Sequence, residues 1–223
     1  MKVNTRMTSN PITATPKTTY REAMHLMQDN HIRHLPIVNE KGRLVGLVSH
    51  SDMLSASPSP VTTLSVFEMY SLLDKVTMDE IMSTPVMAVE HDCSLSAAAR
   101  FMTDNEIGCL PIVDGDELVG IITDADLFKT FVEIMGGGQP GSRVEVQMPD
   151  EKGQLAAVLG AMVAAGSYIV SVTLFYDKPG YAIANIKERG GDEEQLRAEL
   201  EKLGTAEILE FRSTEENRLL TFS

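Results

Sequence analysis

Apolar and polar positions along the first 135 residues follow two periods, one typical of helices and one typical of strands. Short apolar runs at 34–38 (HLPIV) and 109–113 (CLPIV) favour strands, and each follows a helical run that ends in asparagine, YREAMHLMQDN or LSAAARFMTDN. A turn at 39–42 or 114–116 then leads to a second apolar strand. The pattern therefore predicts two β-hairpins, each preceded by a helix.

Each second strand runs into the pattern Ser/Thr-x-x-Asp, as GLVSHSD at 46–52 and as GIITDAD at 120–126. Such an ending is typical of a capped helix start, and in the second copy it predicts a helix that begins at Leu127. A helix start also offers free backbone N–H groups and a partial positive charge, so the same residues suit a phosphate and a sugar. Capping and ligand binding can coexist at such a turn.

These similarities extend over two repeats, at 1–55 and 76–135, each with a proline-containing leading segment. A repeat of this size buries too little surface alone, so the two are expected to pack face to face with a pseudo-twofold relation. Between them, 55–60 (SASPSP) is predicted to be non-helical and 64–73 to be a helix.

The segment 136–142 is rich in glycine, which predicts a linker. Beyond it, the apolar pattern alternates between strand and helix periods, and the chain ends in a tail at 214–223. Strands are predicted at 143–148, 167–176, 181–187 and 206–211, and helices at 154–165 and 193–203. The order βαββαβ fits a ferredoxin-like fold. The fold class is therefore α+β, with the domains 1–75, 76–135 and 143–213.

The stretch 154–176 carries no charge and is long enough to span a bilayer. Its first half follows helical spacing, Gly166 and Ser167 interrupt it, and its second half looks like a strand. We therefore expect a helix, a turn and a strand rather than a membrane span.

Composition excludes several classes of partner. The net charge of −13 and the pI near 4.8 argue against binding to nucleic acid or to an anionic membrane.

The two cysteines, Cys93 and Cys109, lack metal-ligand spacing and predict neither a disulfide framework nor a zinc site. No secretory signal is visible, so a cytoplasmic location is expected. No catalytic pair or P-loop emerges, which favours a protein that is not an enzyme.

The repeated pair resembles the CBS domain pair, the regulatory module named after cystathionine beta-synthase. The resemblance covers roughly the first 135 residues and rests on elements that occur twice in register. These are Pro11 and Pro85, LPIV in both copies, Leu44-Val-Gly46 and Leu118-Val-Gly120, and the two Ser/Thr-x-x-Asp endings.

The resemblance implies that an adenosyl compound of the AMP, ATP or S-adenosylmethionine class binds in the cleft between the repeats. In CBS pairs the hydroxyl typically meets phosphate and the carboxylate accepts hydrogen bonds from ribose, while residues before the LPIV strand flank the purine. Carried onto this chain, the candidate ligand-binding residues are Arg33, His34, Ser49, Asp52, Gly108, Cys109, Thr123 and Asp126.

The charges near the two sites differ. Arg33 makes the pocket that it borders the better candidate for a phosphate. His50 stands in the first copy where Asp124 stands in the second, so we expect two pockets with unequal ligand preference. The acidic second repeat favours AMP or S-adenosylmethionine over ATP unless Mg²⁺ accompanies the polyphosphate. His31 and His34 lack a third ligand, so no metal site is predicted there, and no cofactor is required.

The turn Asp150-x-x-Gly153-x-Leu155 resembles a pattern of ACT domains, small regulatory modules that usually bind amino acids. Gly153 would let a ligand or a partner backbone approach the helix start closely. A CBS pair followed by an ACT domain resembles the bacterial acetoin-utilisation protein family. Both modules commonly associate, and an exposed edge strand favours the same outcome, so a homodimer is expected, with a regulated enzyme as a possible further partner.

The expected function is non-enzymatic ligand sensing, with an amino-acid site or a dimer contact in the ACT-like domain. One alternative is a structural interaction protein whose CBS pockets are degenerate. A second alternative is an enzyme whose site lies between the two modules.

Overall fold

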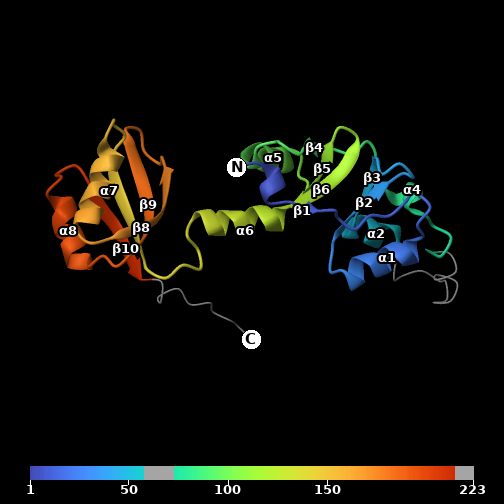
Figure 1. The fold of residues 1–223 in the computed structure, drawn as a ribbon, viewed down its shortest axis with the longest axis horizontal. Coiled ribbons are helices and arrows are strands. Elements are labelled where there is room, and N and C mark those ends of the chain that lie inside the picture. Colours follow the sequence, from blue (N-terminus) through green and yellow to red (C-terminus); the bar gives the residue numbers. More distant parts are fainter. Residues whose placement is uncertain (58–72, 214–223) are drawn as a thin grey trace. The chain divides into compact units, whose positions relative to one another are not determined.

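The computed structural model describes residues 1–57 and 73–213. Its chain divides into two compact units, one from Met1 to Phe128 and the other from Lys129 onward. The first unit contains both repeats, and the second contains the predicted βαββαβ segment (Figure 1). The first unit has one hydrophobic core in each repeat and the second unit has one core, and the two units are described separately below.

The two repeats have matching elements. In the first, helix α1 precedes the hairpin β2–β3 and helix α2 follows it; in the second, α5 precedes the hairpin β5–β6 and α6 follows it. The bounds are α1 (Tyr20–Asp29), β2 (His34–Val38), β3 (Leu44–Ser49), α2 (His50–Ala56), α5 (Leu95–Asp104), β5 (Cys109–Asp114), β6 (Glu117–Thr123) and α6 (Asp124–Ile134). The predicted hairpins are confirmed, with β2 antiparallel to β3 and β5 antiparallel to β6. The two hairpin turns also meet, because the amide of Leu44 donates to the carbonyl of Asp116 at 3.4 Å.

The leading segments are exchanged between the repeats. The short helix η1 (Val3–Thr5) and strand β1 (Thr8–Ser9) belong to the core of the second repeat, where β1 pairs antiparallel with β6 and Val3 is fully buried. Conversely, α4 (Met78–Ile81) places Met78 in the core of the first repeat. Strand β4 (Val89–Glu90) then returns the chain to the second sheet, parallel to β5.

A methionine of each exchanged segment covers a glycine of the opposite hairpin. A Cβ atom on Gly46 would lie 2.2 Å from Met82 Sδ, and one on Gly120 would lie 2.4 Å from Met7 Sδ. Both distances are far inside van der Waals contact. In both copies a methionine therefore occupies the space that a side chain at the glycine of Leu-Val-Gly would take.

Two predicted boundaries were wrong. Helix α6 begins at Asp124 rather than Leu127, because Thr123 caps the helix and Asp126 already lies in its first turn. Helix α2 continues through Ala56 into the stretch that was predicted to be non-helical. It ends at Ser57, whose backbone is extended as expected for a residue that precedes proline. The predicted helix at 64–73 lies almost wholly outside the described residues, as does the predicted tail at 214–223.

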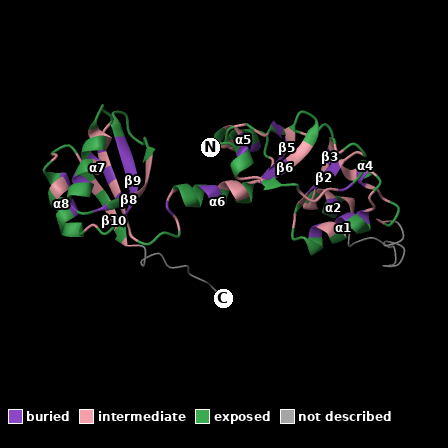
Figure 2. Ribbon diagram, viewed as in Figure 1, coloured by how far each residue is buried: buried purple, intermediate pink, exposed green. Residues whose placement is uncertain are grey.

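The second unit is a four-stranded antiparallel sheet with the strand order β10-β7-β9-β8 and two helices that pack on one face (Figure 1). Its elements are β7 (Ser142–Pro149), α7 (Gln154–Ala164), β8 (Tyr168–Phe175), β9 (Tyr181–Arg189), α8 (Glu193–Glu201) and β10 (Glu207–Ser213). This order confirms the predicted ferredoxin-like α+β fold. Strand β9 is central and buried along most of its length (Figure 2), whereas β8 and β10 form the edges.

The uncharged stretch at 154–176 is the helix α7, a turn and the strand β8, as predicted. In the part of the chain that the structure describes, no helix has the length and apolar character that crossing a bilayer requires.

Candidate functional site

The site begins where β3 ends and α2 starts. Ser49 is the last residue of β3 and the N-cap of α2, and its hydroxyl oxygen accepts the amide of Asp52 at 3.1 Å. The amide and hydroxyl of Ser49 both donate to Asp52 Oδ2, each at 2.7 Å. This reciprocal capping box fixes both side chains at the start of the helix.

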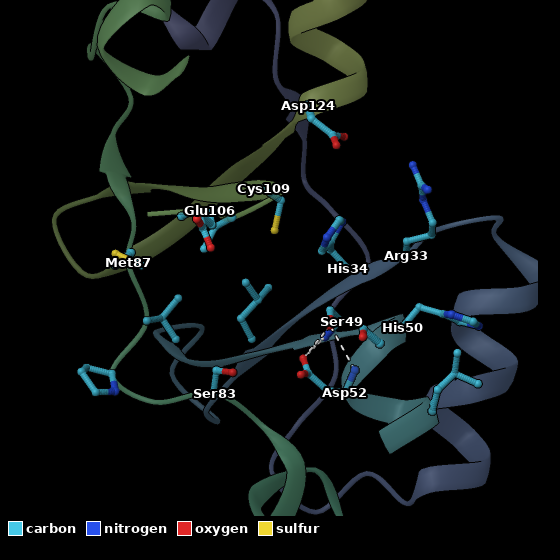
Figure 3. Close-up of a pocket in the computed structure, with 17 residues that line it drawn as sticks. Arg33, His34, Ser49, His50, Asp52, Ser83, Met87, Glu106, Cys109 and Asp124 are labelled. Atoms are coloured by element: carbon cyan, nitrogen blue, oxygen red, sulfur yellow. Dashed lines mark hydrogen bonds between the residues drawn. The ribbon is translucent and has the colours of Figure 1, made fainter. Parts of the chain in front are cut away.

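A cavity of about 620 Å³ opens beside this helix start and is enclosed by both repeats (Figure 3). The first repeat contributes strand ends and the first turn of α2, and the second contributes its leading segment, the start of β5 and the start of α6. The lining residues are Arg33, His34, Leu47, Ser49, His50, Ser51, Asp52, Leu54, Ser83, Pro85, Val86, Met87, Glu106, Ile107, Gly108, Cys109 and Asp124. The volume lies in the range of sites for small organic ligands.

Asp52 keeps an acceptor for a ligand despite its capping role. Its Oδ2 atom accepts the bonds from Ser49, while Oδ1 accepts none from the described residues. A carboxylate oxygen can accept two hydrogen bonds, so Oδ1 is suited to the hydroxyl groups of a sugar. The helix start adds a partial positive charge to the same part of the cavity.

His34, Gly108 and Asp124 meet at the boundary between the repeats. A Cβ on Gly108 would lie 3.6 Å from His34 Nε2 and 3.7 Å from Asp124 Oδ2. Burial lowers the pKa of His34, and Arg33 acts in the same direction, whereas Asp124 and Asp52 oppose the shift. His34 is therefore held toward its neutral form, in which the ring both donates and accepts a hydrogen bond.

Cys109 is a buried thiol at the wall of the cavity. Burial, assisted by the charge of Asp124, raises the pKa of its thiol to about 12. The thiol therefore stays protonated at neutral pH, and only the thiolate is a good nucleophile or metal ligand. Cys109 is 3% exposed and serves as a small apolar wall of the cavity.

Six of the eight residues predicted for the adenosyl site line this one cavity: Arg33, His34, Ser49, Asp52, Gly108 and Cys109. The structure places the other two, Thr123 and Asp126, at the start of α6, where they form the equivalent capping box. They do not line this cavity, and their role stays a prediction.

The sequence did not mark several lining residues as site residues, although it drew attention to two of them. The sequence shows that Asp124 in the second copy corresponds to His50 in the first, and in the structure both residues line the cavity. Ser83 and Met87 flank the Pro85 motif and enter the cavity because the leading segments are exchanged. No periodic signal in the sequence shows that exchange.

The predicted ACT residues lie at the junction of β7 and α7. The amide of Asp150 donates to the carbonyl of Gly180 at 2.9 Å, and Leu155 packs against the core. Gly153 is the N-cap of α7 with a φ of 95°, a left-handed conformation that favours glycine. A Cβ there would meet nothing within 4 Å, so backbone conformation, not crowding, explains this glycine.

The histidines considered for a metal do not form a cluster. Within residues 1–57 and 73–213, the group that could hold an ion consists of Glu90, His91 and Asp114. It lies at the surface where β4 meets β5, away from the residues that line the cavity.

The two repeats share one fold, are joined by hydrogen bonds and together line a cleft of the size of a small ligand. This arrangement is that of a duplicated ligand-binding module. The CBS domain family model matches residues 3–59 and 78–133. The chain therefore belongs to the CBS domain family.

Known proteins support this assignment. A Vibrio cholerae protein assigned to acetoin utilization (AcuB) is similar in structure, with 37% identity and a TM-score of 0.52 over 61% of this chain and 93% of that one. The CBS domain pair of protein MJ0100, in complex with 5′-methylthioadenosine and S-adenosyl-L-methionine, has 29% identity and a TM-score of 0.50 over 60% of this chain and 97% of that one.

Among curated relatives, the uncharacterized protein MJ1404 of Methanocaldococcus jannaschii is 32% identical over 66% of this chain and 35% of its own length. The chain spans between about a third and three fifths of the length of the first curated relatives. Relatives also include an enzyme, the L-aspartate semialdehyde sulfurtransferase of the same organism, of which the chain covers 21%. The matched residues end at 133, so the ACT assignment of the second unit stays a prediction.

Proposed function

We propose that this protein is a non-enzymatic ligand sensor that binds an adenosyl compound of the AMP, ATP or S-adenosylmethionine class in the cleft between its CBS repeats. The observation that carries the proposal is the convergence of Arg33, Ser49 and Asp52 with Gly108 and Cys109 of the other repeat on one cavity. A relative of the same fold was solved with 5′-methylthioadenosine and S-adenosyl-L-methionine.

The lining residues suit the parts of such a ligand. Asp52 Oδ1 is the acceptor for ribose hydroxyl groups, and Arg33 is the cation for a phosphate or a carboxylate. His34 and the start of β5 offer apolar and hydrogen-bonding surface to the purine. The carboxylates of Glu106 and Asp124 also line the cavity and disfavour a polyphosphate unless Mg²⁺ accompanies it.

The alternative is a structural dimerisation protein whose cleft binds nothing. It draws support from the loss of pseudo-symmetry, since His50 lines the cavity at the helix position that Asp124 occupies in the other repeat.

Ligand binding separates the two functions. The wild-type protein and Asp52→Ala are titrated with AMP, ADP, ATP and S-adenosylmethionine by calorimetry and by thermal shift. A ligand at a hundred times its dissociation constant stabilises the folded state by about 2.7 kcal/mol. Loss of Asp52 is expected to weaken the best ligand at least about tenfold, because a hydrogen bond to a charged group contributes about 1.5–3 kcal/mol.

The matched control is Glu22→Ala. Glu22 forms an equivalent capping box with Thr19 at the start of α1, and it does not line the cavity. This variant loses a helix cap of the same kind but should keep the wild-type affinity. If no adenosyl ligand changes the wild-type melting temperature, the sensor is excluded and the structural alternative stands; turnover of a ligand would instead indicate an enzyme.

The second unit is proposed to serve as an ACT-like regulatory domain that binds an amino acid near Asp150, Gly153 and Leu155 or joins a second chain into a homodimer. The dimer is supported by the edge strand β8, which exposes Tyr168, Leu174 and Phe175. The same thermal-shift panel with free amino acids tests the first role.

A further inference from the structure

Three cations form a row across the second unit. Arg143 on β7 pairs in register with Lys187 on β9 and with Arg212 on β10, so adjacent strands bring the three side chains together. Their neighbours Val144, Ile186 and Phe211 pack into the core, so the cations lie on the sheet face opposite α7 and α8. Three like charges in a row cost free energy, and they are unusual in a chain with a net charge of −13.

These side chains surround a small cavity. Its volume is about 120 Å³, and its lining consists of the three cations and the linker residues at 136–139. Sites for drug-sized ligands measure about 300–1,000 Å³, so this cavity has room for a small ion or for one charged group of a larger ligand.

The cations are built into the unit. Lys187 is 3% exposed, and its Nζ donates to the carbonyl of Gly141 at 2.8 Å. Arg143 donates to Asn185 Oδ1 at 2.5 Å and to the carbonyl of Met135 at 3.1 Å. These three acceptors are neutral, and the bonds orient the two side chains at the wall of the cavity.

Both cations and carboxylates border the cavity. Burial lowers the pKa of Lys187, Arg143 acts in the same direction, and Glu188 opposes the shift. Glu210 pairs with Arg212 at the exposed edge, and Glu145 accepts a bond from Asn185. A bound anion would favour the charged form of Lys187 and would offset the repulsion among the three cations.

The linker adds backbone donors. Gly138 has a φ of 79°, and its amide donates to no acceptor within the described residues. Gly141 has a φ of 123°, and a Cβ there would lie 2.0 Å from the carbonyl oxygen of Glu188. At Gly141 the linker therefore passes too close to β9 for any residue except glycine, and this close approach places the linker beside the cationic row.

We propose that this cavity is a binding site for a small oxyanion, with Arg143, Lys187 and Arg212 as its cations and the glycine linker as its wall. The shared chemistry is that of a phosphate or a carboxylate group, both of which match the planar guanidinium. Occupancy ties the linker at 136–139 to three strands. The proposal is independent of the adenosyl site.

The test uses the full chain in a phosphate-free chloride buffer. Inorganic phosphate and acetate are titrated at constant ionic strength by calorimetry, and the melting temperature is measured in parallel. The two titrations distinguish a site for phosphate groups from a site for carboxylate groups. The wild-type protein is expected to bind one of them with a dissociation constant in the millimolar range or below and to melt at a higher temperature.

Two variants locate the site. Arg212→Gln, at the exposed edge, should weaken binding at least about tenfold without unfolding the protein, because it removes one charge-assisted contact. Lys187→Met should abolish binding, and Arg212→Gln decides the matter if Lys187→Met fails to fold. The matched control is Lys178→Met in the exposed turn before β9, which removes one positive charge outside the cavity.

The proposal is overturned if neither anion binds to the folded wild-type protein. It is equally overturned if Lys178→Met weakens binding as much as Arg212→Gln, because the effect would then reflect net charge alone. Both variants of the cationic row should retain the response to adenosyl ligands, so failure here is distinguishable from failure of the proposed sensor.

Discussion

At the scale of single residues, the two oxygen atoms of Asp52 divide two tasks. Oδ2 holds the helix start by accepting both donors of Ser49, and Oδ1 is left for a ligand. The equivalent carboxylate Asp126 forms the same box with Thr123, but only the first box borders Arg33 and the cavity. The difference between the repeats therefore arises from the neighbours of the box and not from the box itself.

Asp126→Ala is expected to leave the affinity of the cleft for its tightest adenosyl ligand within about threefold of wild type. The reason is that Asp126 does not line the cavity, and substitutions at sites without shared partners are usually not coupled. Calorimetry of Asp126→Ala beside Asp52→Ala provides the comparison. Equal weakening by both variants would show that the tight site uses the second box.

His34 predicts a dependence of stability on pH. Its pKa is lowered in the folded protein, chiefly by burial, so below the ordinary value of about 6.5 the unfolded chain takes up the proton more readily. Stability that is present above pH 6.5 is therefore lost as the pH falls through the folded pKa.

Denaturant unfolding between pH 7.5 and about pH 5 measures this loss, and His34→Gln should show a shallower decline. His25→Gln, with an exposed side chain on α1, is the control and should follow the wild type. Parallel curves for wild type and His34→Gln would contradict the assignment.

At the scale of elements, the contact between a methionine and a glycine joins each hairpin to a leading segment. Gly46 and Gly120 lack a side chain at the positions that Met82 and Met7 occupy. Their backbone conformations are not left-handed, so a cost of substitution would come from crowding and not from backbone strain.

Gly46→Ala is expected to destabilise the protein by about 1–3 kcal/mol through overpacking. Removing the obstructing side chain in Gly46→Ala/Met82→Ala should relieve the overpacking, so the two substitutions should cost less together than their separate effects predict. The free energy of unfolding in denaturant measures both effects.

Gly160→Ala is the matched control, because a Cβ on this exposed residue of α7 meets nothing within 4 Å. The same substitution should there stabilise the protein by about 0.5–1 kcal/mol, as expected inside a helix. If Gly46→Ala does not destabilise the protein relative to Gly160→Ala, Met82 moves aside freely and the overpacking account is wrong.

At the scale of the whole molecule, the exposed edge strands bear on the proposed association of two chains. Strand β8 exposes Tyr168, Leu174 and Phe175, whereas β10 at the other edge exposes Leu209. Apolar edge strands without charge tend to pair with another chain.

In the proposed homodimer, Phe175→Lys is therefore expected to raise the dissociation constant at least about tenfold, since a charge at the pairing edge opposes association. Light scattering coupled to size-exclusion chromatography measures the mass over a dilution series. Leu209→Lys on β10 is the control and should leave the dimer intact; the reverse result would place the contact on β10.

Much of the fold could be predicted from the sequence, in the first unit because each local pattern occurs twice and in the second because its apolar periodicity is clear. The hairpins, the helices before them and the βαββαβ order appeared where apolar periodicity predicted them. The exchange of leading segments could not be predicted, because Val3 and Met78 are ordinary apolar residues whose partners are chosen by tertiary packing. The site was predicted only in part. The repeated pattern marked the residues at its strand ends, whereas Ser83 and Met87 reach the cavity through the exchange of leading segments.

The exchange also bears on how the protein is made. Thr8 pairs with Ile121, so about half of the chain must leave the ribosome before the first strand finds its neighbour. Until then, Val3 and Met7 are apolar residues on a nascent segment without their partners, and the second core stays incomplete. Nucleation within one repeat cannot finish either repeat, and the two must complete each other late in synthesis.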